Sequence, residues 1–510
     1  MILKLPARVQ NRAWLWLVPV FLLTIYVHAP SLYMGFTGDD FDWWQLARMG
    51  LEEPSLLLAD AGTFYRPGNT WSLALDYLLF GTQPVGYHVT NLLLHLTCGL
   101  SLWVLLGRFS LPASARSAVT VLWLCSPYSL QPVQWICFRF DPLLLLSWLT
   151  LACLWPGPEQ RWSRARFAGA LVLTGLMPFL KETWVILPGF IFCFDLCLSR
   201  APLRKALYRS ALAGLAALVY VVIYFFAFPG DKDSYYSGGL KAAAKIPHAW
   251  AVFSSLTTLQ PSEFPFGAIE AFSLLIIGAL VWLGWRCRSS LMGVGLAFFL
   301  LPFLPILPVD FLPTRYTTAP LVGFLMMNCA GIRELIAALK GRQRRVSLGV
   351  VTALVLLVLA ANLSWLQGDM VDARLFSDAH ARLLAETRAF LPYLPRDRLI
   401  VAIRLENDNP LVELAARDPY GIPKLYYQRQ YAPYGLISWS TLLSYTLDPL
   451  GGPLYVEVQP DEAGDSNYAV IGHVRGGFVQ LPAEAPTARE AAAAWRSRPA
   501  YVRLVKPWGK

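Results

Sequence analysis

Carboxylates and cations gather in this sequence where its apolar segments end. Three carboxylates, Asp39, Asp40 and Asp42, fall within four residues directly after the first apolar run. Other charged side chains hold comparable positions at the ends of later apolar runs: Arg66, Arg139, Asp141, Lys181, Glu182 and Arg315. Ionisable groups beside a membrane core are costly to keep, so we treat each as a candidate for function.

Five of these charges also have a structural interpretation. The pair Lys181–Glu182 could turn a tight hairpin at the level of the lipid headgroups. Arg139 and Asp141 could form a local ion pair, and Arg315 could anchor a helix at the interface. Several cations that meet a carboxylate cluster on one face favour an anion-binding pocket with acid–base chemistry.

Such a pocket suits a phosphate ester held at a membrane surface. Arg and Lys bind phosphate, and the planar guanidinium does so through two parallel hydrogen bonds. A nearby carboxylate kept ionised by these cations can take a proton from an attacking hydroxyl. The same cations stabilise the charge that grows on a departing phosphate. With a lipid tail between the apolar segments, this chemistry describes glycosyl transfer from a lipid-phosphate sugar.

The elements that position these groups are membrane helices. Of 510 residues, 56% are hydrophobic and 15% charged, whereas soluble chains carry about 25% charged residues. Residues through Leu366 hold 27 basic and 17 acidic side chains, which accounts for the net charge of +10, and later residues are balanced. The basic excess therefore orients the spans, and we expect no nucleic-acid partner.

The fold class expected is an all-α polytopic membrane bundle of about eleven spans, with a small extracytoplasmic α/β domain. The predicted spans lie near 13–32, 87–107, 114–131, 141–155, 166–180, 183–198, 209–228, 267–285, 291–308, 317–333 and 346–366. Basic loops alternate with the remaining loops along these spans, which places the N-terminus in the cytoplasm and the C-terminus outside.

Two domains are expected, a transmembrane domain over 1–366 and an extracytoplasmic domain over 367–510. The transmembrane part has two long outer loops, 33–85 and 229–266. In the first, helices are predicted over Phe41–Met49 and Trp71–Phe80. In the second domain, a helix near 369–391 precedes strand-like segments at 399–403, 454–458 and 468–474.

The order of several short motifs resembles the GT-C superfamily of polytopic glycosyltransferases that use polyprenyl-phosphate sugars. The matching stretches are Gly38-Asp39-Asp40, Tyr65-Arg66-Pro67, Gly86 to His95, Ser126 to Asp141, Lys181-Glu182 and Arg315-Tyr316. The likeness spans roughly residues 15–330 and is greatest to the tetratricopeptide-bearing transmembrane O-mannosyltransferases and their bacterial relatives. This chain departs from them at Ser126 and Gln131-Pro132, and it has no tetratricopeptide repeats.

The resemblance implies an inverting transferase of the bacterial inner membrane, with Asp39 as the catalytic carboxylate and Asp40 as its partner. Were a divalent cation used, these two aspartates would bind it; Cys and His spacing indicates no other metal site. Arg66, Arg315, Lys181 and Arg139 are the candidates for the donor phosphate. Supporting roles are expected for Asp42, Tyr65, His88, Asp141, Glu182 and Tyr316.

The partners implied are a polyprenyl-phosphate-linked sugar, a hydroxyl-bearing protein, glycan or lipid acceptor, and the bilayer. A lipid-linked glycan transporter or flippase is the competing class, but such folds keep ionisable residues near the bilayer midplane, where these spans are nearly free of charge. A non-catalytic membrane scaffold would explain the membrane helices, but it would not explain the cluster of charged residues.

Overall fold

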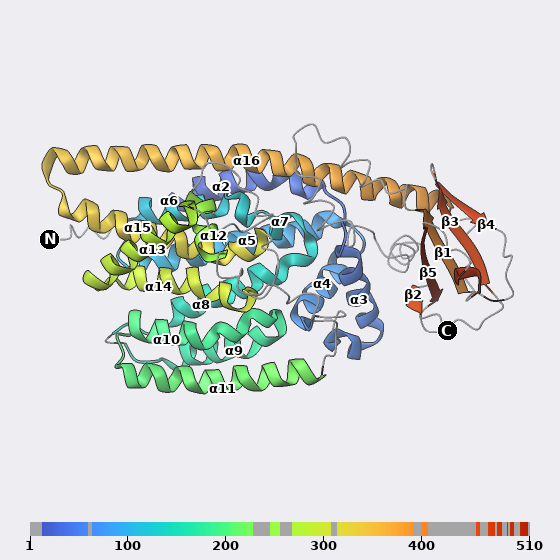
Figure 1. Cartoon of the computed structure of the whole chain (residues 1–510), viewed down its shortest axis with the longest axis horizontal. Coiled ribbons are helices and arrows are strands. Elements are labelled where there is room, and N and C mark those ends of the chain that lie inside the picture. The colour runs from blue at the N-terminus through green and yellow to red at the C-terminus, as the bar shows by residue number, and fades with distance from the viewer. Residues whose placement is uncertain are drawn as a thin grey trace.

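The computed structural model of this chain is a helical bundle with a small β-sheet at one end (Figure 1). It describes residues 13–59, 64–158, 160–227, 245–254, 268–307 and 314–390, and then 399–405, 455–458, 468–474, 477–481, 487, 490–493 and 500–507. The α-helices are α2 (Leu17–His28), α3 (Asp40–Glu52), α4 (Pro67–Phe80), α5 (Pro84–Gly107), α6 (Ala113–Leu124), α7 (Gln131–Gln134), α8 (Phe140–Leu154), α9 (Arg164–Leu180), α10 (Leu187–Cys197), α11 (Leu203–Ala227), α12 (Lys245–Ser254), α13 (Ala268–Arg286), α14 (Ser290–Leu300), α15 (Thr318–Ala338) and α16 (Gly341–Phe390).

Short 3₁₀ helices join many of these α-helices. They are η1 (Ala13–Trp16), η2 (Ala29–Tyr33), η3 (Pro54–Leu58), η4 (Pro127–Ser129), η5 (Ile136–Arg139), η6 (Glu182–Ile186), η8 (Leu301–Ile306) and η9 (Thr314–Thr317). Three of them, η5, η6 and η9, carry residues from the expected charge cluster.

Seven helical stretches in the described part of the chain are long and apolar enough to cross a membrane. They are Ala13–Tyr33, Pro84–Gly107, Ile136–Leu154, Leu203–Tyr224, Ala268–Arg286, Arg315–Ala338 and Gly341–Val371. Each coincides with a predicted span. By the length and composition of these helices the chain is a multi-pass membrane protein.

The other four predicted spans correspond to the shorter helices α6, α9, α10 and α14, so the count of eleven is not confirmed. Proline explains much of the shortening, because its ring interrupts the helical hydrogen bonds. Pro127 follows the end of α6, Pro178 lies near the end of α9, and Pro302 and Pro305 turn the continuation of α14 into η8.

The bundle core contains a close approach of α14 to α15. A Cβ built on Gly323 would lie 2.2 Å from the Phe299 backbone nitrogen and 2.5 Å from the Gly295 carbonyl oxygen. Beside this contact, the Trp250 ring meets the rings of Phe299 and Phe324 edge-on. Glycine therefore sets the distance between the two helices, and aromatic side chains fill the space around them.

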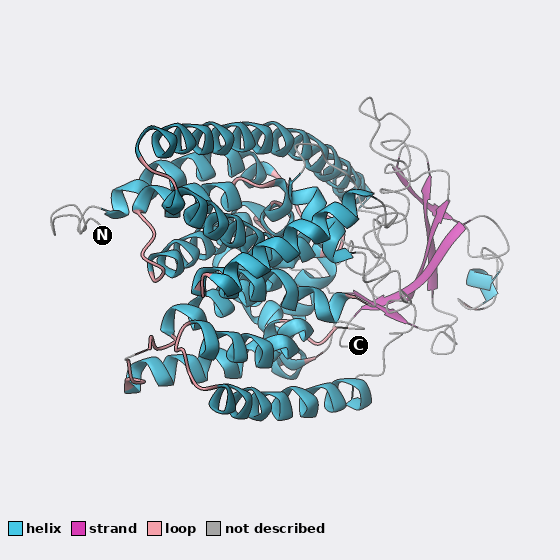
Figure 2. Cartoon of the chain, turned by 60° about the vertical axis from the view of Figure 1, so that its left-hand side comes forward, coloured by secondary structure: helices cyan, strands magenta, loops and turns pink. Residues whose placement is uncertain are grey.

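Helix α16 crosses the whole length of the bundle and leads toward the sheet (Figure 1). The strands are β1 (Leu399–Leu405), β2 (Tyr455–Val458), β3 (Tyr468–Val474), β4 (Gly477–Leu481) and β5 (Ala500–Pro507), in the order β2-β5-β1-β3-β4. Only β1 and β3 pair in parallel; the other pairs are antiparallel. Figure 2 shows the strands gathered on one side of the helices.

Two sequence predictions about this region change. The helices expected near 346–366 and 369–391 are one continuous helix of 50 residues, because no proline separates them and the helix continues through Gly368, so the boundary at 366 falls inside α16. The division into two domains stays a prediction.

Of the loop predicted at 229–266, the structure describes α12 alone, and the remainder lies outside the described residues.

Helices α3 and α4 lie at the end of the bundle that faces the sheet, which we call the sheet end (Figure 1). Helix α3 continues past Gly50, where the sequence predicts its end, and α4 begins at Pro67, four residues before the predicted start. Proline is favoured in the first turn of a helix, because the backbone N–H that it lacks would have no partner within the helix at that position. Helices α3 and α4 therefore bring residues of the long loop predicted at 33–85 together at the sheet end.

The glycine contact between α14 and α15 gives a prediction for stability. Gly323→Ala should lower the free energy of unfolding by about 1–3 kcal/mol, since the added methyl group meets backbone atoms that cannot move separately. The measurement is the melting temperature of the full chain in detergent. Gly349→Ala on α16 is the control, because a Cβ there meets nothing within 4 Å. Equal melting temperatures for the two variants would contradict the close approach.

Candidate active site

The residues Thr37 to Asp40 form a tight turn that starts α3. Gly38 has φ +49°, a conformation that glycine adopts without a steric penalty. Both oxygens of Asp40 accept hydrogen bonds: Oδ2 from the Thr37 backbone N–H at 2.9 Å and from the Thr37 hydroxyl at 3.2 Å, and Oδ1 from the Cys137 N–H at 2.7 Å. Asp40 is 1% exposed. Its carboxylate therefore joins the turn to η5.

Asp39 sits in the N-cap position of α3, but its carboxylate forms no capping hydrogen bond. The side chain is half-buried, unlike that of Asp40. Burial raises the pKa of Asp39, while the positive charges of Arg315 and then Arg66 act to lower it. This carboxylate is thus partly buried, and cations from two distant segments act on it.

Arg66 is fixed by a two-pronged ion pair with Glu182. Its Nε donates to Oε2 at 2.8 Å, and its Nη2 donates to Oε1 at 2.6 Å. The guanidinium lies over the rings of Phe64 and Phe140, 4.2 and 4.1 Å from their centroids. Burial alone would raise the pKa of Glu182, but the charge and hydrogen bonds of Arg66 outweigh it and hold the pKa below its usual value.

Lys181 forms the next ion pair, with Asp141. Its Nζ also lies 4.5 Å from the ring centroid of Tyr316 and 5.2 Å from that of Phe140. Burial lowers the pKa of Lys181, and the charge of Asp141 opposes that effect. The sequence predicts that Lys181 and Glu182 lie near the other charges, and the structure brings them to Asp141 and Arg66 respectively.

Arg315 lies on η9, just before α15. Its backbone N–H donates to the Gln131 side-chain oxygen at 3.0 Å, and its guanidinium lies 4.2 Å from the centroid of the Phe138 ring and 4.9 Å from that of Tyr316. A small cleft opens here. Its charged and phenolic lining residues are Asp141, Lys181, Arg315 and Tyr316, and two threonines together with apolar side chains such as Trp148 line the remainder.

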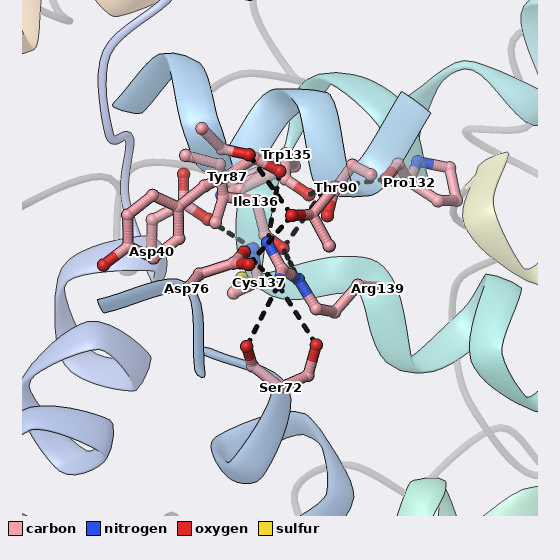
Figure 3. Close-up of polar contacts among 12 residues, drawn as sticks. Asp40, Ser72, Asp76, Tyr87, Thr90, Pro132, Trp135, Ile136, Cys137 and Arg139 are labelled. Atoms are coloured by element: carbon pink, nitrogen blue, oxygen red, sulfur yellow. Dashed lines mark hydrogen bonds and ion pairs between the residues drawn. The ribbon is translucent and has the colours of Figure 1, made fainter. Parts of the chain in front are cut away.

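Arg139 has a different partner from the one suggested by the sequence (Figure 3). Instead of a local pair with Asp141, its guanidinium forms an ion pair with Asp76 of α4. It also donates to the Ser72 hydroxyl at 3.1 Å and to the Tyr87 carbonyl at 3.3 Å. Arg139 is 0% exposed. This geometry favours a role in joining α4, α5 and η5 over contact with a donor phosphate.

The remaining predicted residues occupy varied places. Asp42 is exposed on α3, and Tyr65 is half-buried with its ring 6.3 Å from that of Phe179. His88 is fully buried in α5, where its Nδ1 lies 3.5 Å from the Val133 carbonyl oxygen. Tyr316 packs between Lys181 and Arg315.

The turn offers two carboxylates, Asp39 and Asp40, as candidate ligands for a divalent cation. Among the described residues no three His, Cys, Asp or Glu side chains are grouped as metal ligands. The hydrogen bonds of Asp40 occupy both of its oxygens and leave Asp39 as a single carboxylate at the turn. A hydrogen-bonded carboxylate oxygen can still bind a cation, and Mg²⁺ is often held by one or two carboxylates together with substrate phosphates, so a divalent cation at these two aspartates stays a prediction.

Two residues of this region escape the sequence prediction. Asp76, which pairs with Arg139 and accepts the Thr90 hydroxyl at 2.8 Å, lies on the helix predicted over Trp71–Phe80. A carboxylate in that largely apolar run is a signal that could have identified it. The sequence singles out Gln131 only as a departure from the family motif and does not predict its hold on the Arg315 backbone, because only the fold brings residues 184 positions apart together.

Comparison with known proteins leaves the activity open. No protein-family model matches the sequence, and no curated protein is significantly similar to it. Two solved structures are similar: ArnT from Cupriavidus metallidurans bound to undecaprenyl phosphate, at 14% identity over 88% of this chain and 94% of that chain with TM-score 0.44, and the apo state, at 14% identity over 96% and 97% with TM-score 0.46. At these values the likeness assigns no residue role to this chain.

The burial of Asp40 predicts a pH dependence of stability. Burial raises its pKa to about 7 against the opposing hydrogen bonds from Cys137 and Thr37, whereas the unfolded value is about 3.9. The folded state then binds the proton more tightly. Its stabilising contribution is present below about pH 4 and is lost as the pH rises through 7. Melting temperatures between pH 4 and 8 should therefore fall more steeply for the wild type than for Asp40→Asn.

The control for this titration is Glu53→Gln, which changes an exposed carboxylate beyond the end of α3. It should keep the wild-type slope. If Asp40→Asn also keeps that slope, Asp40 does not change its protonation with folding in this range.

Proposed function

We propose that this protein is a membrane glycosyltransferase that moves a sugar from a polyprenyl-phosphate donor to a hydroxyl acceptor. The observation that supports it best is the partly buried carboxylate of Asp39, on which Arg315 and Arg66 both act. Arg315 and Lys181 also line the adjoining cleft. A carboxylate next to cations suits a reaction in which a hydroxyl loses a proton and a phosphate departs.

In this proposal Asp39 is the general base. It accepts the acceptor's proton, while Asp40 keeps the turn in place through its three hydrogen bonds. Burial raises the pKa of Asp39 above its usual value, which makes the ionised carboxylate a stronger proton acceptor near neutral pH. A general base works best when its pKa lies near the working pH.

The donor phosphate would lie against Arg315 and Lys181 in the cleft. Glu182 holds the Arg66 guanidinium in one plane, so Arg66 adds positive charge at a fixed place. Asp141 positions Lys181 in the same way. Positioned cations stabilise a transition state without the cost of rearrangement during the reaction.

The reaction is a direct displacement. The acceptor oxygen forms a bond to the anomeric carbon as the bond from that carbon to the phosphate oxygen breaks. Polyprenyl phosphate leaves with the bonding electron pair, and the acceptor proton passes to Asp39. Attack from the face opposite to the departing phosphate inverts the anomeric configuration. The donor sugar is a hexose or a pentose, and the acceptor is a protein, a glycan or a lipid.

The sheet end is proposed as the outer face of a bacterial inner membrane, with the N-terminus in the cytoplasm. Basic residues flank the opposite ends of the spans in the sequence, as positive-inside ordering requires. Residues 367–510 would then form the extracytoplasmic domain. A donor that carries its sugar outside the cell would reach Asp39 from the membrane.

Replacing the proposed base gives the central prediction. Asp39→Asn should reduce transfer by at least about a hundredfold, because the amide cannot accept the proton. Lipid-linked sugars and surface glycans compared between cells with and without the protein identify the donor. Membranes supplied with that radiolabelled polyprenyl-phosphate sugar then give the rate.

Glu53→Gln is the matched control and should leave the rate near that of the wild type. Near-normal turnover by Asp39→Asn, in protein that melts at the wild-type temperature, would remove Asp39 from the role of base. Absence of transfer by the wild type with every lipid-linked sugar of the host would remove the proposed function.

A second prediction concerns the phosphate and needs no knowledge of the sugar. Arg315→Gln should weaken the binding of undecaprenyl phosphate to the purified protein by about tenfold or more, since a hydrogen-bonded charge contact is lost. Arg344→Gln, at an exposed position near the start of α16, is the control. Unchanged affinity in Arg315→Gln would place the phosphate elsewhere.

A further inference from the structure

One face of α16 continues past the membrane-spanning length of the helix. Leu366, Met370, Ala373 and Ser377 follow one another at intervals of four, three and four residues, which places them on the same side. The side chains of Leu366, Met370 and Ser377 are buried. We call these four residues the α16 stripe.

The α16 stripe packs against two separate segments of the bundle. Leu366 and Met370 form a hydrophobic cluster with Met34 and Leu130. The Ser377 hydroxyl accepts a hydrogen bond from the Gly35 backbone N–H at 2.7 Å, across 342 residues of sequence. This contact is directional, whereas the hydrophobic contacts permit small displacements.

Both segments lead directly to the candidate active site. Gly35 lies four residues before Asp39, and the turn from Thr37 to Asp40 follows it. Leu130 precedes Gln131, whose side chain holds the backbone of Arg315. A few residues later, the Cys137 N–H binds Asp40. The α16 stripe thus contacts the segments that position Asp39, the proposed base, and Arg315, a proposed phosphate ligand.

We propose that Ser377 is a positioning residue for Asp39. Its hydroxyl fixes the Gly35 amide, and through it the path of the chain into the Thr37–Asp40 turn. The proposal rests on the proposed function where it concerns rate, and on the fold alone where it concerns the position of the loop. It also connects the active-site loop to α16, the helix that leads into the chain beyond Phe390.

The chemistry of the two groups makes Ser377 the specific candidate. A backbone N–H in a partly buried place requires an acceptor, and Ser377 supplies it from an element outside the loop. Alanine at this position removes that acceptor and keeps the helix. Threonine restores a hydroxyl on the same carbon.

The first measurement is hydrogen exchange of the full chain in detergent, followed in peptides that cover residues 34–44. Ser377→Ala should speed exchange there by about tenfold, and Ser377→Thr should restore protection. The matched control is Ser364→Ala, an exposed serine of the same helix. This result does not depend on any transfer reaction.

The second measurement separates positioning from binding. Ser377→Ala should lower kcat by about tenfold, because small displacements of a reacting group are costly. The affinity for undecaprenyl phosphate should stay within twofold of the wild type, since Gln131 holds the Arg315 backbone and Asp141 and Glu182 hold Lys181 and Arg66. Ser377→Thr should recover most of the rate.

Equal exchange at residues 34–44 in Ser377→Ala and Ser364→Ala would overturn the proposal. So would faster exchange with an unchanged kcat, which would make the contact structural only. If the wild type transfers no sugar, the proposed function fails separately, and the exchange experiment still decides whether Ser377 holds the loop.

Discussion

The cost of burying charge beside an apolar bundle governs the sheet end of this protein. An ion leaves water at a cost of several kcal/mol unless an opposite charge and hydrogen bonds replace the lost solvent. Arg66 pairs with Glu182, Lys181 with Asp141, and Arg139 with Asp76. N–H and O–H donors compensate Asp40 in part, in place of a cation, but burial still raises its pKa. Asp39 is less buried than Asp40, and among the described residues its carboxylate forms no hydrogen-bonded ion pair, so we assign the proposed chemistry to it.

These pairs also connect segments that are far apart in the sequence. Arg66 directly precedes α4 and its partner Glu182 begins η6, while Lys181 reaches back to the first turn of α8. Aromatic rings lie between the pairs, with Phe140 in contact with both Arg66 and Lys181. The ring faces favour cations and exclude water, so the charges keep their places with little freedom to rearrange. That preorganisation is what electrostatic catalysis requires.

The proposed class of enzyme and the proposed roles of single residues rest on different observations. Motif order and charge placement support the transferase, and the helices support the membrane setting, whereas the distant likeness to ArnT supports no residue role. The structure gives different surroundings to residues that hold similar positions in the sequence. Arg139 and Arg315 both follow apolar runs, yet Arg139 is enclosed by Asp76, Ser72 and Tyr87, and Arg315 lines a cleft.

The sequence alone determined the membrane class, seven of the spans, and the positions of the charges at helix ends, because hydropathy and local motifs are readable within short windows. It also singled out the Gly38-Asp39-Asp40 turn. It could not determine partners. The choice of Asp76 for Arg139, the occupation of Asp40 by Cys137, and the contact of Ser377 with Gly35 all join residues more than 60 positions apart. Such contacts form only when packing brings the helices together. In the sequence alone, each of these groups has several possible partners, and the tertiary structure decides which one it meets.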